Sequence, residues 1–391
     1  MANAASKKES KGFDLSNIEE AIQVAISSVT VKDKAIFSRQ FAAMFNAGVG
    51  MLRCLSVLHE QCSNAKLRKA LAEIRGEVEE GGGLANAMTK HPKCFDKLYV
   101  SMVAAGEVGG VLDEVLNRLA MLLEKMAKLQ NELKSAMAYP QTVGFIAVVI
   151  FVAMTVFLLP IFADIFDQLG AELPVFTQFM MNISYILRGP FLPAPGEDPD
   201  ATGLEVRNYY IVMFIGVLVG IAFAIKQYYQ TPAGRFQIDA LLLKAPIFGD
   251  LIEKSAVASF CNVFGTLTRS GVPILNAMEI VRDTAGNEVI ADAIEYARDQ
   301  IQTGGSISEA FQEKGVMPAL AVQMMAIGEE TGELDQMLIK VGQFYEDEVE
   351  QAIKALTSML EPLMIVVIGG MVGSILLSMY LPMFAVMDQI G

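Results

Sequence analysis

The sequence predicts an all-α polytopic membrane protein with two homologous cytoplasmic helical-bundle domains and three transmembrane helices. Long apolar stretches, apolar residues spaced at three- and four-residue steps, and an internal repeat lead to this fold class. Of the 391 residues 53% are hydrophobic, and the mean hydropathy is +0.41. That value is high for a soluble chain, so membrane segments are expected.

Three apolar stretches are long enough to span a bilayer, and none carries a charge at its centre. They centre on residues 143–162, 209–224 and 363–386, and the second can extend to Tyr229. We expect the transmembrane helices at residues 141–163, 209–229 and 362–386. The second stretch is the shortest.

Basic residues predict the topology. They flank one side of the spans: Lys125, Lys128 and Lys134 precede the first, Lys226, Arg235 and Lys244 follow the second, and Lys340 and Lys354 precede the third. The segment between the first two spans has only Arg188 and Arg207. Because basic residues stay on the cytoplasmic side, we expect a protein of the cell inner membrane whose N-terminus lies in the cytoplasm. The cytoplasmic parts are then the polar segment 1–30 and the domains 31–140 and 230–361; the external parts are the loop 164–208 and the tail 387–391.

An internal repeat relates the two polar domains. At an offset of 223, Phe37 matches Phe260 and Gly48 matches Gly271; beyond a one-residue gap the offset is 222, and Pro140 matches Pro362. Each copy is thus a cytoplasmic domain followed by a span, and the second span is an additional element between copies.

The spacing of apolar residues inside a copy is helical. In the first copy it predicts helices over 32–47, 51–62, 64–80, 84–90, 95–106 and 110–139. The last helix leads directly into the first span. Pro140 and Pro362 lie at these membrane junctions, where a proline removes one helical hydrogen bond and can kink the helix.

Composition argues against several function classes. The formal charge is −14, which disfavours nucleic acid as a partner because phosphate binding needs a basic face. Four cysteines without a CxxC pair and two histidines offer no metal spacing, and no phosphate-binding loop motif occurs. We therefore expect no cofactor and no enzymatic reaction. A transporter, the remaining alternative, usually needs ionisable groups inside its spans.

Two sets of residues are candidates for function. The first is a duplicated GE-x-x-G-x-LD motif: Gly106, Glu107, Gly110 and Asp113, with Gly328, Glu329, Gly332 and Asp335. It reads either as a structural helix–turn–helix connection, with each glutamate capping a neighbouring helix, or as a contact for a partner. The second is a pair of GxxxG spacings inside spans: Gly216 and Gly220, and Gly369 and Gly373. These allow close helix packing within one chain or between protomers.

Together these motifs resemble the PilC/GspF family, the inner-membrane platform proteins of type IV pilus assembly and type II secretion. The resemblance rests on AAGEVGGVLDEVL (104–116) with AIGEETGELDQML (326–338), FNAGVGML with TRSGVPIL, and AYP with LEP, and it covers about residues 31–391. It implies a non-enzymatic protein that couples a cytoplasmic hexameric ATPase to insertion or removal of pilin subunits. Other implied partners are inner-membrane pilus proteins, lipid, and a second copy in a homo-oligomer such as a dimer. The residues do not distinguish pilus assembly from secretion, and pilus assembly is the preferred expectation on prior grounds alone.

Overall fold

A computed structural model describes residues 27–168, 173–188, 209–246 and 248–390. Those residues form helices and connections, with no β-strand among them, which confirms the all-α class. They divide into two compact units. The first contains the described residues up to Asn131 together with Asp250–Val349, and the second contains Glu132–Gly249 and Glu350 onward. The segments 1–26 and 189–208, which hold most of the polar N-terminus and part of the expected external loop, lie outside the described residues.

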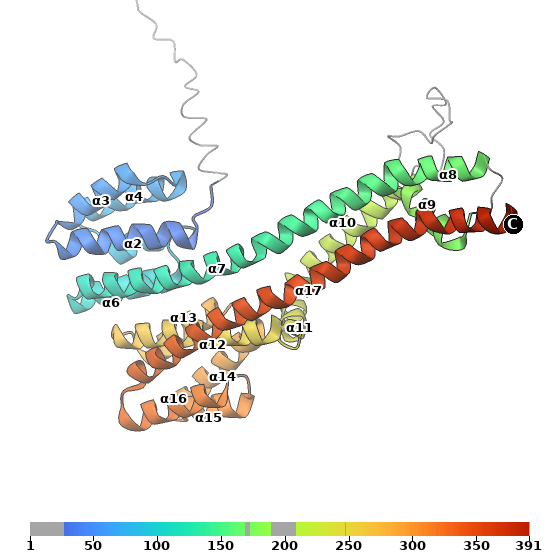
Figure 1. The fold of residues 1–391 in the computed structure, drawn as a ribbon. Coiled ribbons are helices and arrows are strands. Elements are labelled where there is room, and N and C mark those ends of the chain that lie inside the picture. Colours follow the sequence, from blue (N-terminus) through green and yellow to red (C-terminus); the bar gives the residue numbers. More distant parts are fainter. Residues whose placement is uncertain (1–26, 169–172, 189–208, 247, 391) are drawn as a thin grey trace, which may run out of the picture. The chain divides into compact units, whose positions relative to one another are not determined.

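The first repeat follows the predicted helix order (Figure 1). Its helices are α2 (Val31–Asn46), α3 (Met51–Gln61), α4 (Ala65–Glu79), α5 (Leu84–Thr89), α6 (Lys97–Gly109) and α7 (Leu112–Ala153). Local chemistry fixes where they begin. Thr30 and Asp33 form a reciprocal capping box at α2, and the side chains of Asn64 and Asp96 accept backbone N–H bonds at the starts of α4 and α6.

The second repeat has the same order of helices. They are α12 (Phe248–Arg269), α13 (Ile274–Thr284), α14 (Glu288–Gln302), α15 (Ile307–Lys314), α16 (Ala319–Thr331) and α17 (Leu334–Ile390). Asn287 caps α14 just as its counterpart Asn64 caps α4. The duplication seen in the sequence is therefore a duplication of structure.

One hydrophobic cluster runs through the first unit and includes residues of both repeats. Matching phenylalanines anchor it: Phe37 packs edge-on against Phe95 at 5.7 Å between ring centroids, and its counterpart Phe260 packs against Phe311 at 5.1 Å. Such pairs contribute roughly 0.5–1.5 kcal/mol beyond their buried area. Buried Tyr99 shares a 3.0 Å hydrogen bond with Ser38. The amphipathic stripes expected from the sequence thus form a common core.

The second unit holds the apolar helices. A π-helix (Met154–Leu158) and α8 (Leu159–Gln168) follow α7, and then come α9 (Val175–Arg188), α10 (Tyr209–Tyr229) and α11 (Pro232–Leu243). Among the described residues two helical stretches, Leu112–Phe166 and Leu334–Phe384, are long and apolar enough to cross a membrane. The segment α10 coincides with the predicted second span. Helix α9 forms inside the segment expected to be an external loop, where it packs on α8 through Met180 and Met181.

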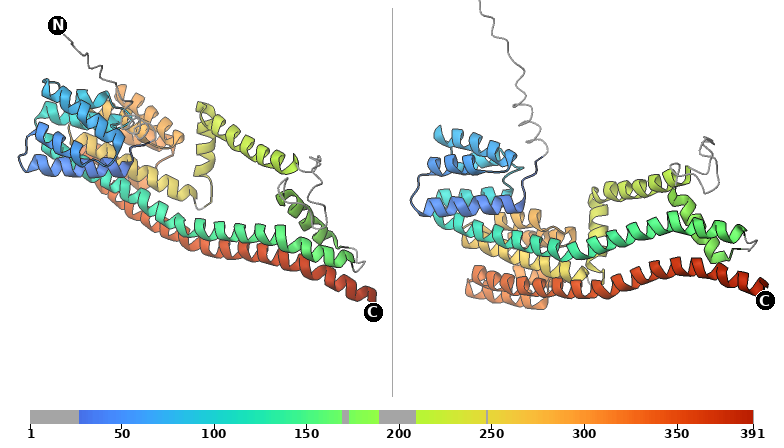
Figure 2. Two further views of the ribbon diagram at one scale, coloured as in Figure 1. Left: turned by 90° about the horizontal axis from the view of Figure 1, so that it is seen from above. Right: turned by 45° about the horizontal axis from the view of Figure 1, so that its top comes forward.

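The junction prolines do not end their helices. Helix α7 continues through Pro140, and α17 continues through Pro362 and Pro382. Within the second unit Gly144 of α7 lies beside Met364 of α17, and Figure 2 shows the parts of these two helices that belong to this unit running alongside each other. A Cβ at residue 144 would lie 3.4 Å from the Met364 methyl, which is an ordinary van der Waals contact distance.

Candidate functional site

In the first repeat the duplicated motif forms the tight turn between α6 and α7. Gly110 has a φ of +66°, a left-handed conformation that glycine adopts without strain. The Val111 N–H donates to the Gly106 carbonyl at 3.0 Å and closes the turn. A Cβ at Gly106 would lie 3.1 Å from the Leu112 Cα. Glycine at residue 106 therefore leaves room for α6 to pack this tightly on the start of α7. Asp113 stands in the first turn of α7, where a carboxylate favours the helix dipole.

The second copy repeats this geometry between α16 and α17. Gly332 has a φ of +75°, and a Cβ at Gly328 would lie only 2.8 Å from the Leu334 Cα. Asp335 lies in the first turn of α17. The glycines and the aspartate of the motif are therefore explained by the turn itself.

The motif glutamates face into their own repeats. The Glu107 carboxylate accepts hydrogen bonds from the backbone N–H groups of Leu84 at 2.6 Å and Ala85 at 2.9 Å. These are the first two residues of α5, whose N-cap residue Gly83 has no side chain to offer. Since the first N–H groups of a helix lack intrahelical partners, Glu107 supplies a cap from a distant point of the sequence.

Glu329 makes the corresponding cap for α15, with additional bonds. Its carboxylate accepts from the N–H groups of Ile307 at 2.6 Å and Ser308 at 3.0 Å. The hydroxyls of Ser306 and Ser308 donate to it at 2.7 and 2.6 Å. Partial burial alone would raise the pKa of Glu329, but the hydrogen bonds from the two serines and the two amides outweigh it and lower the pKa.

These contacts match the structural alternative that the sequence left open, in which each carboxylate caps a neighbouring helix of its own domain. The motif ties α5 to α6 in the first repeat and α15 to α16 in the second. The residues of each turn that follow the glutamate are exposed, from Val108 to Val111 and from Glu330 to Glu333. Val108 is 92% exposed, and its counterpart Glu330 is also exposed. Sequence reasoning missed these two positions because they lie at a variable position of the motif.

The membrane glycines lie on open helix faces. No described residue comes within 4 Å of where a Cβ would stand at Gly216, Gly220, Gly369 or Gly373. Within the second unit it is Gly144 of α7 that faces another helix, at Met364 of α17. The four predicted glycines are thus available to lipid or to another copy.

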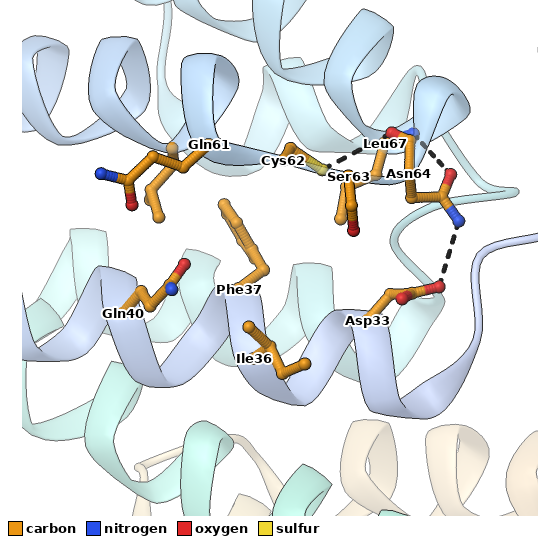
Figure 3. Close-up of a pocket in the computed structure, with 10 residues that line it drawn as sticks. Asp33, Ile36, Phe37, Gln40, Gln61, Cys62, Ser63, Asn64 and Leu67 are labelled. Carbon is orange, nitrogen blue, oxygen red and sulfur yellow. Dashed lines mark hydrogen bonds between the residues drawn. The ribbon is translucent and has the colours of Figure 1, made fainter.

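The first repeat also contains a small cavity between α2 and the α3–α4 connection (Figure 3). Its volume is about 70 Å³, far below that of a typical small-molecule site. The Asn64 amide donates to the Asp33 carboxylate at 3.0 Å across it. Cys62 beside it carries a free thiol whose pKa is raised, chiefly by burial. Among the described residues no group of histidine, cysteine and carboxylate side chains is arranged to hold a metal ion.

Comparison with known proteins gives the family. The model for type II secretion system (T2SS) protein F matches residues 37–160 and 260–382, which are the two copies of the repeat, each with the apolar helix that follows it. The chain belongs to this family of membrane-associated assembly proteins, which are not enzymes.

The relatives agree with one another. The type IV pilus assembly protein PilC of Myxococcus xanthus is 40% identical over 92% of this chain and 81% of its own length. PilC of Thermus thermophilus is 41% identical over 92% of this chain and 84% of its own length. The type II secretion system protein F of Xanthomonas campestris pv. campestris is 32% identical over 91% of this chain and 83% of its own length.

Proposed function

We propose that this chain is the inner-membrane platform protein of a type IV pilus machine. The observation that carries the proposal is the duplicated arrangement itself. Each capped helical domain leads without a break into a helix long and apolar enough to cross a membrane. A movement imposed on the polar domain would therefore pass along a continuous helix into the bilayer.

The partners are those that the family resemblance implies. A cytoplasmic hexameric ATPase would act on the polar repeats, and pilin subunits and other inner-membrane pilus proteins would meet the apolar helices. The turns of the duplicated motif are the candidate contacts for the ATPase. Because Glu107 and Glu329 cap helices inside their own repeats, we place the partner-facing role on the exposed Val108 and Glu330 that follow them.

The topology of the proposal is that expected from the basic residues. Three spans at residues 141–163, 209–229 and 362–386 would place the N-terminus and both repeats in the cytoplasm. Helix α10 supports the second crossing, because Tyr209–Tyr229 is an uninterrupted apolar helix with Lys226 in its last turn. A lysine at that end suits the cytoplasmic interface.

Pilus assembly is preferred to secretion because the pilus relatives are closer. The identities to PilC proteins of Myxococcus xanthus and Thermus thermophilus are 40% and 41%, against 32% and 27% for protein F of Xanthomonas campestris pv. campestris and Vibrio cholerae.

Deletion of the gene followed by complementation tests the proposal. We expect the deletion strain to lose surface fibres, as counted by electron microscopy, and to keep its secreted proteins. Complementation with the whole chain should restore the fibres. A strain that keeps its fibres but loses secreted proteins would assign the chain to the secretion machine, and a strain with neither defect would refute the platform function.

A further inference from the structure

The two repeats pack against each other in the first unit through different faces. The face offered by the first repeat, which we name the donor face, lies on α6 and α7 and consists of Lys97, Arg118, Leu122 and Lys125. The face offered by the second repeat, which we name the acceptor face, lies on α12, the turn that follows it and α13. It consists of Asn262, Thr266, Ser270 and Asp283. The bonds that cross include Lys97 to Asp283 at 2.6 Å, Arg118 to the carbonyl of Arg269 at 2.6 Å, and Lys125 to Glu346 of α17 at 2.9 Å.

Because the two repeats share one fold, each also carries the counterpart of the face that the other uses. In the second repeat the donor positions are Ala319, Lys340, Phe344 and Asp347. In the first repeat the acceptor positions are Arg39, Ala43, Ala47 and Glu60. Within the part of the chain that the structure describes, no hydrogen bond or ion pair joins these two counterpart faces. The contact between repeats is therefore heterologous, and such a contact leaves one face of each kind free.

Exposure shows that both counterpart faces are free. Leu122 of the donor face is 4% exposed, while its counterpart Phe344 is 47% exposed. Ser270 of the acceptor face is 9% exposed, while its counterpart Ala47 is exposed. The position that is covered between the repeats at Leu122 is thus open at Phe344.

The charges on the two free faces differ from those on the faces that meet between the repeats, and they differ on both faces. Between the repeats Lys125 and the amide of Asn262 both reach the Glu346 carboxylate. The counterpart of Lys125 is Asp347, and the counterpart of Asn262 is Arg39.

Between the repeats the cation is Lys125, on the donor face. On the two free faces the cation is Arg39, on the acceptor side. Arg39 is half-exposed and bonds Glu124, the counterpart of Glu346. Asp347 would approach this arginine where Lys125 approaches a carboxylate, so opposite charges still meet.

Two further pairs keep the faces compatible. Lys340 stands at the position of Arg118 and, in such a contact, would present a cation to the carbonyl end of α2, where the helix dipole is negative. Phe344 replaces the smaller Leu122, and Ala43 replaces the larger Thr266 on the opposite face. One pair is lost, because Ala319 stands where Lys97 does and leaves Glu60 unmatched. The second contact should therefore be weaker than the one inside the chain.

We propose that a second copy of this chain docks head to tail, with the free donor face of its second repeat on the free acceptor face of the first repeat. The contact repeats between copies the packing already present between repeats. A heterologous contact of this kind closes into a ring or continues as a row, according to the rotation between repeats.

A charge-swap cycle in the full-length chain tests this contact. Asp347→Lys places two cations together, and Arg39→Asn places Asp347 beside an unpaired Glu124. Each single variant should weaken association of differently tagged copies by about tenfold or more. The double variant reproduces the pairing found between the repeats and should restore association. Failure of the double variant to recover, or singles that associate like wild type, would overturn the proposal.

Cross-linking locates the contact directly. One tagged copy carries Lys340→Cys and a second carries Ala47→Cys, and a short bismaleimide joins them in native membranes. Because each copy has one new cysteine, an adduct of the two tags can form only between copies, and pairs with one cysteine alone give the background from the native thiols. We expect the adduct to survive Phe344→Leu and to disappear with Phe344→Glu. Copies that do not co-purify, or an adduct that Phe344→Glu leaves unchanged, would contradict the head-to-tail contact.

Discussion

Replacing Glu329 with glutamine should destabilise the first unit and identify the glutamate as a helix cap. The Oε1 atom of Glu329 accepts from Ile307 N–H, and Oε2 accepts from Ser308 N–H and two serine hydroxyls. Glutamine keeps one oxygen and turns an N–H₂ group toward donors. The lost hydrogen bonds are charge-assisted, and the expected cost is about 3 kcal/mol. For Glu107, which makes two such bonds, we expect about 1–2 kcal/mol.

Far-UV circular dichroism of the full-length chain in detergent measures the effect, since the chain has no tryptophan. A loss of about 3 kcal/mol should lower the melting temperature by about 6–12 °C for a unit of this size. Glu330→Gln is the matched control, because it makes the same chemical change at an exposed neighbour and should leave the melting temperature unchanged.

The pH dependence gives a second check on Glu329. Its pKa in the folded chain is lower than the ordinary value of about 4.5, so the stabilisation is fully present above that pH. It is lost as pH falls through the lowered pKa, and wild type and Glu329→Gln should converge in acid. If instead Glu107→Gln and Glu329→Gln melt like wild type while surface fibres vanish, the carboxylates act in coupling and the capping argument fails.

Three further outcomes are expected. Gly328→Ala should cost about 2–3 kcal/mol in the same melt, because its Cβ would lie 2.8 Å from a backbone atom of α17; an unchanged melt would mean that α16 can move away. Leucine at both Gly369 and Gly373 should leave the melt unchanged, because both positions are open, and should reduce oligomer in sizing chromatography; an unchanged oligomer would place this face against lipid. Reporters fused at Pro199 should read external and those at Gly304 cytoplasmic, and a cytoplasmic reading at Pro199 would invert the topology.

Much of the fold could be predicted from sequence because the repeat and the helical period agree. The capped starts at Thr30, Asn64 and Asp96 and the left-handed Gly110 are local features that the sequence displays directly. The element that sequence reasoning did not predict is α9, which lies in the segment expected to be an external loop. Its 14 residues are too few to span a bilayer, so a search for spanning stretches does not find it. Its packing on α8 is a tertiary effect that local composition does not report.

The site was predictable only in part. The motif could be located, but the direction of Glu107 depended on α5 being brought beside α6, which is a long-range contact. The same holds for the faces between the repeats. Nothing local to Lys125 indicates that it meets Glu346 across two domains, whereas comparing each residue with its counterpart reveals which faces are covered and which are free.

Site-specific photocross-linking in living cells tests the platform account most directly. A photoreactive residue at Val108 or at Glu330 stands on the outward side of each motif turn, and one at Gly216 serves as the control in the apolar helix α10. The account predicts adducts with the pilus ATPase from the two turns and none from Gly216. Fibre-producing cells in which neither turn gives an ATPase adduct would contradict it.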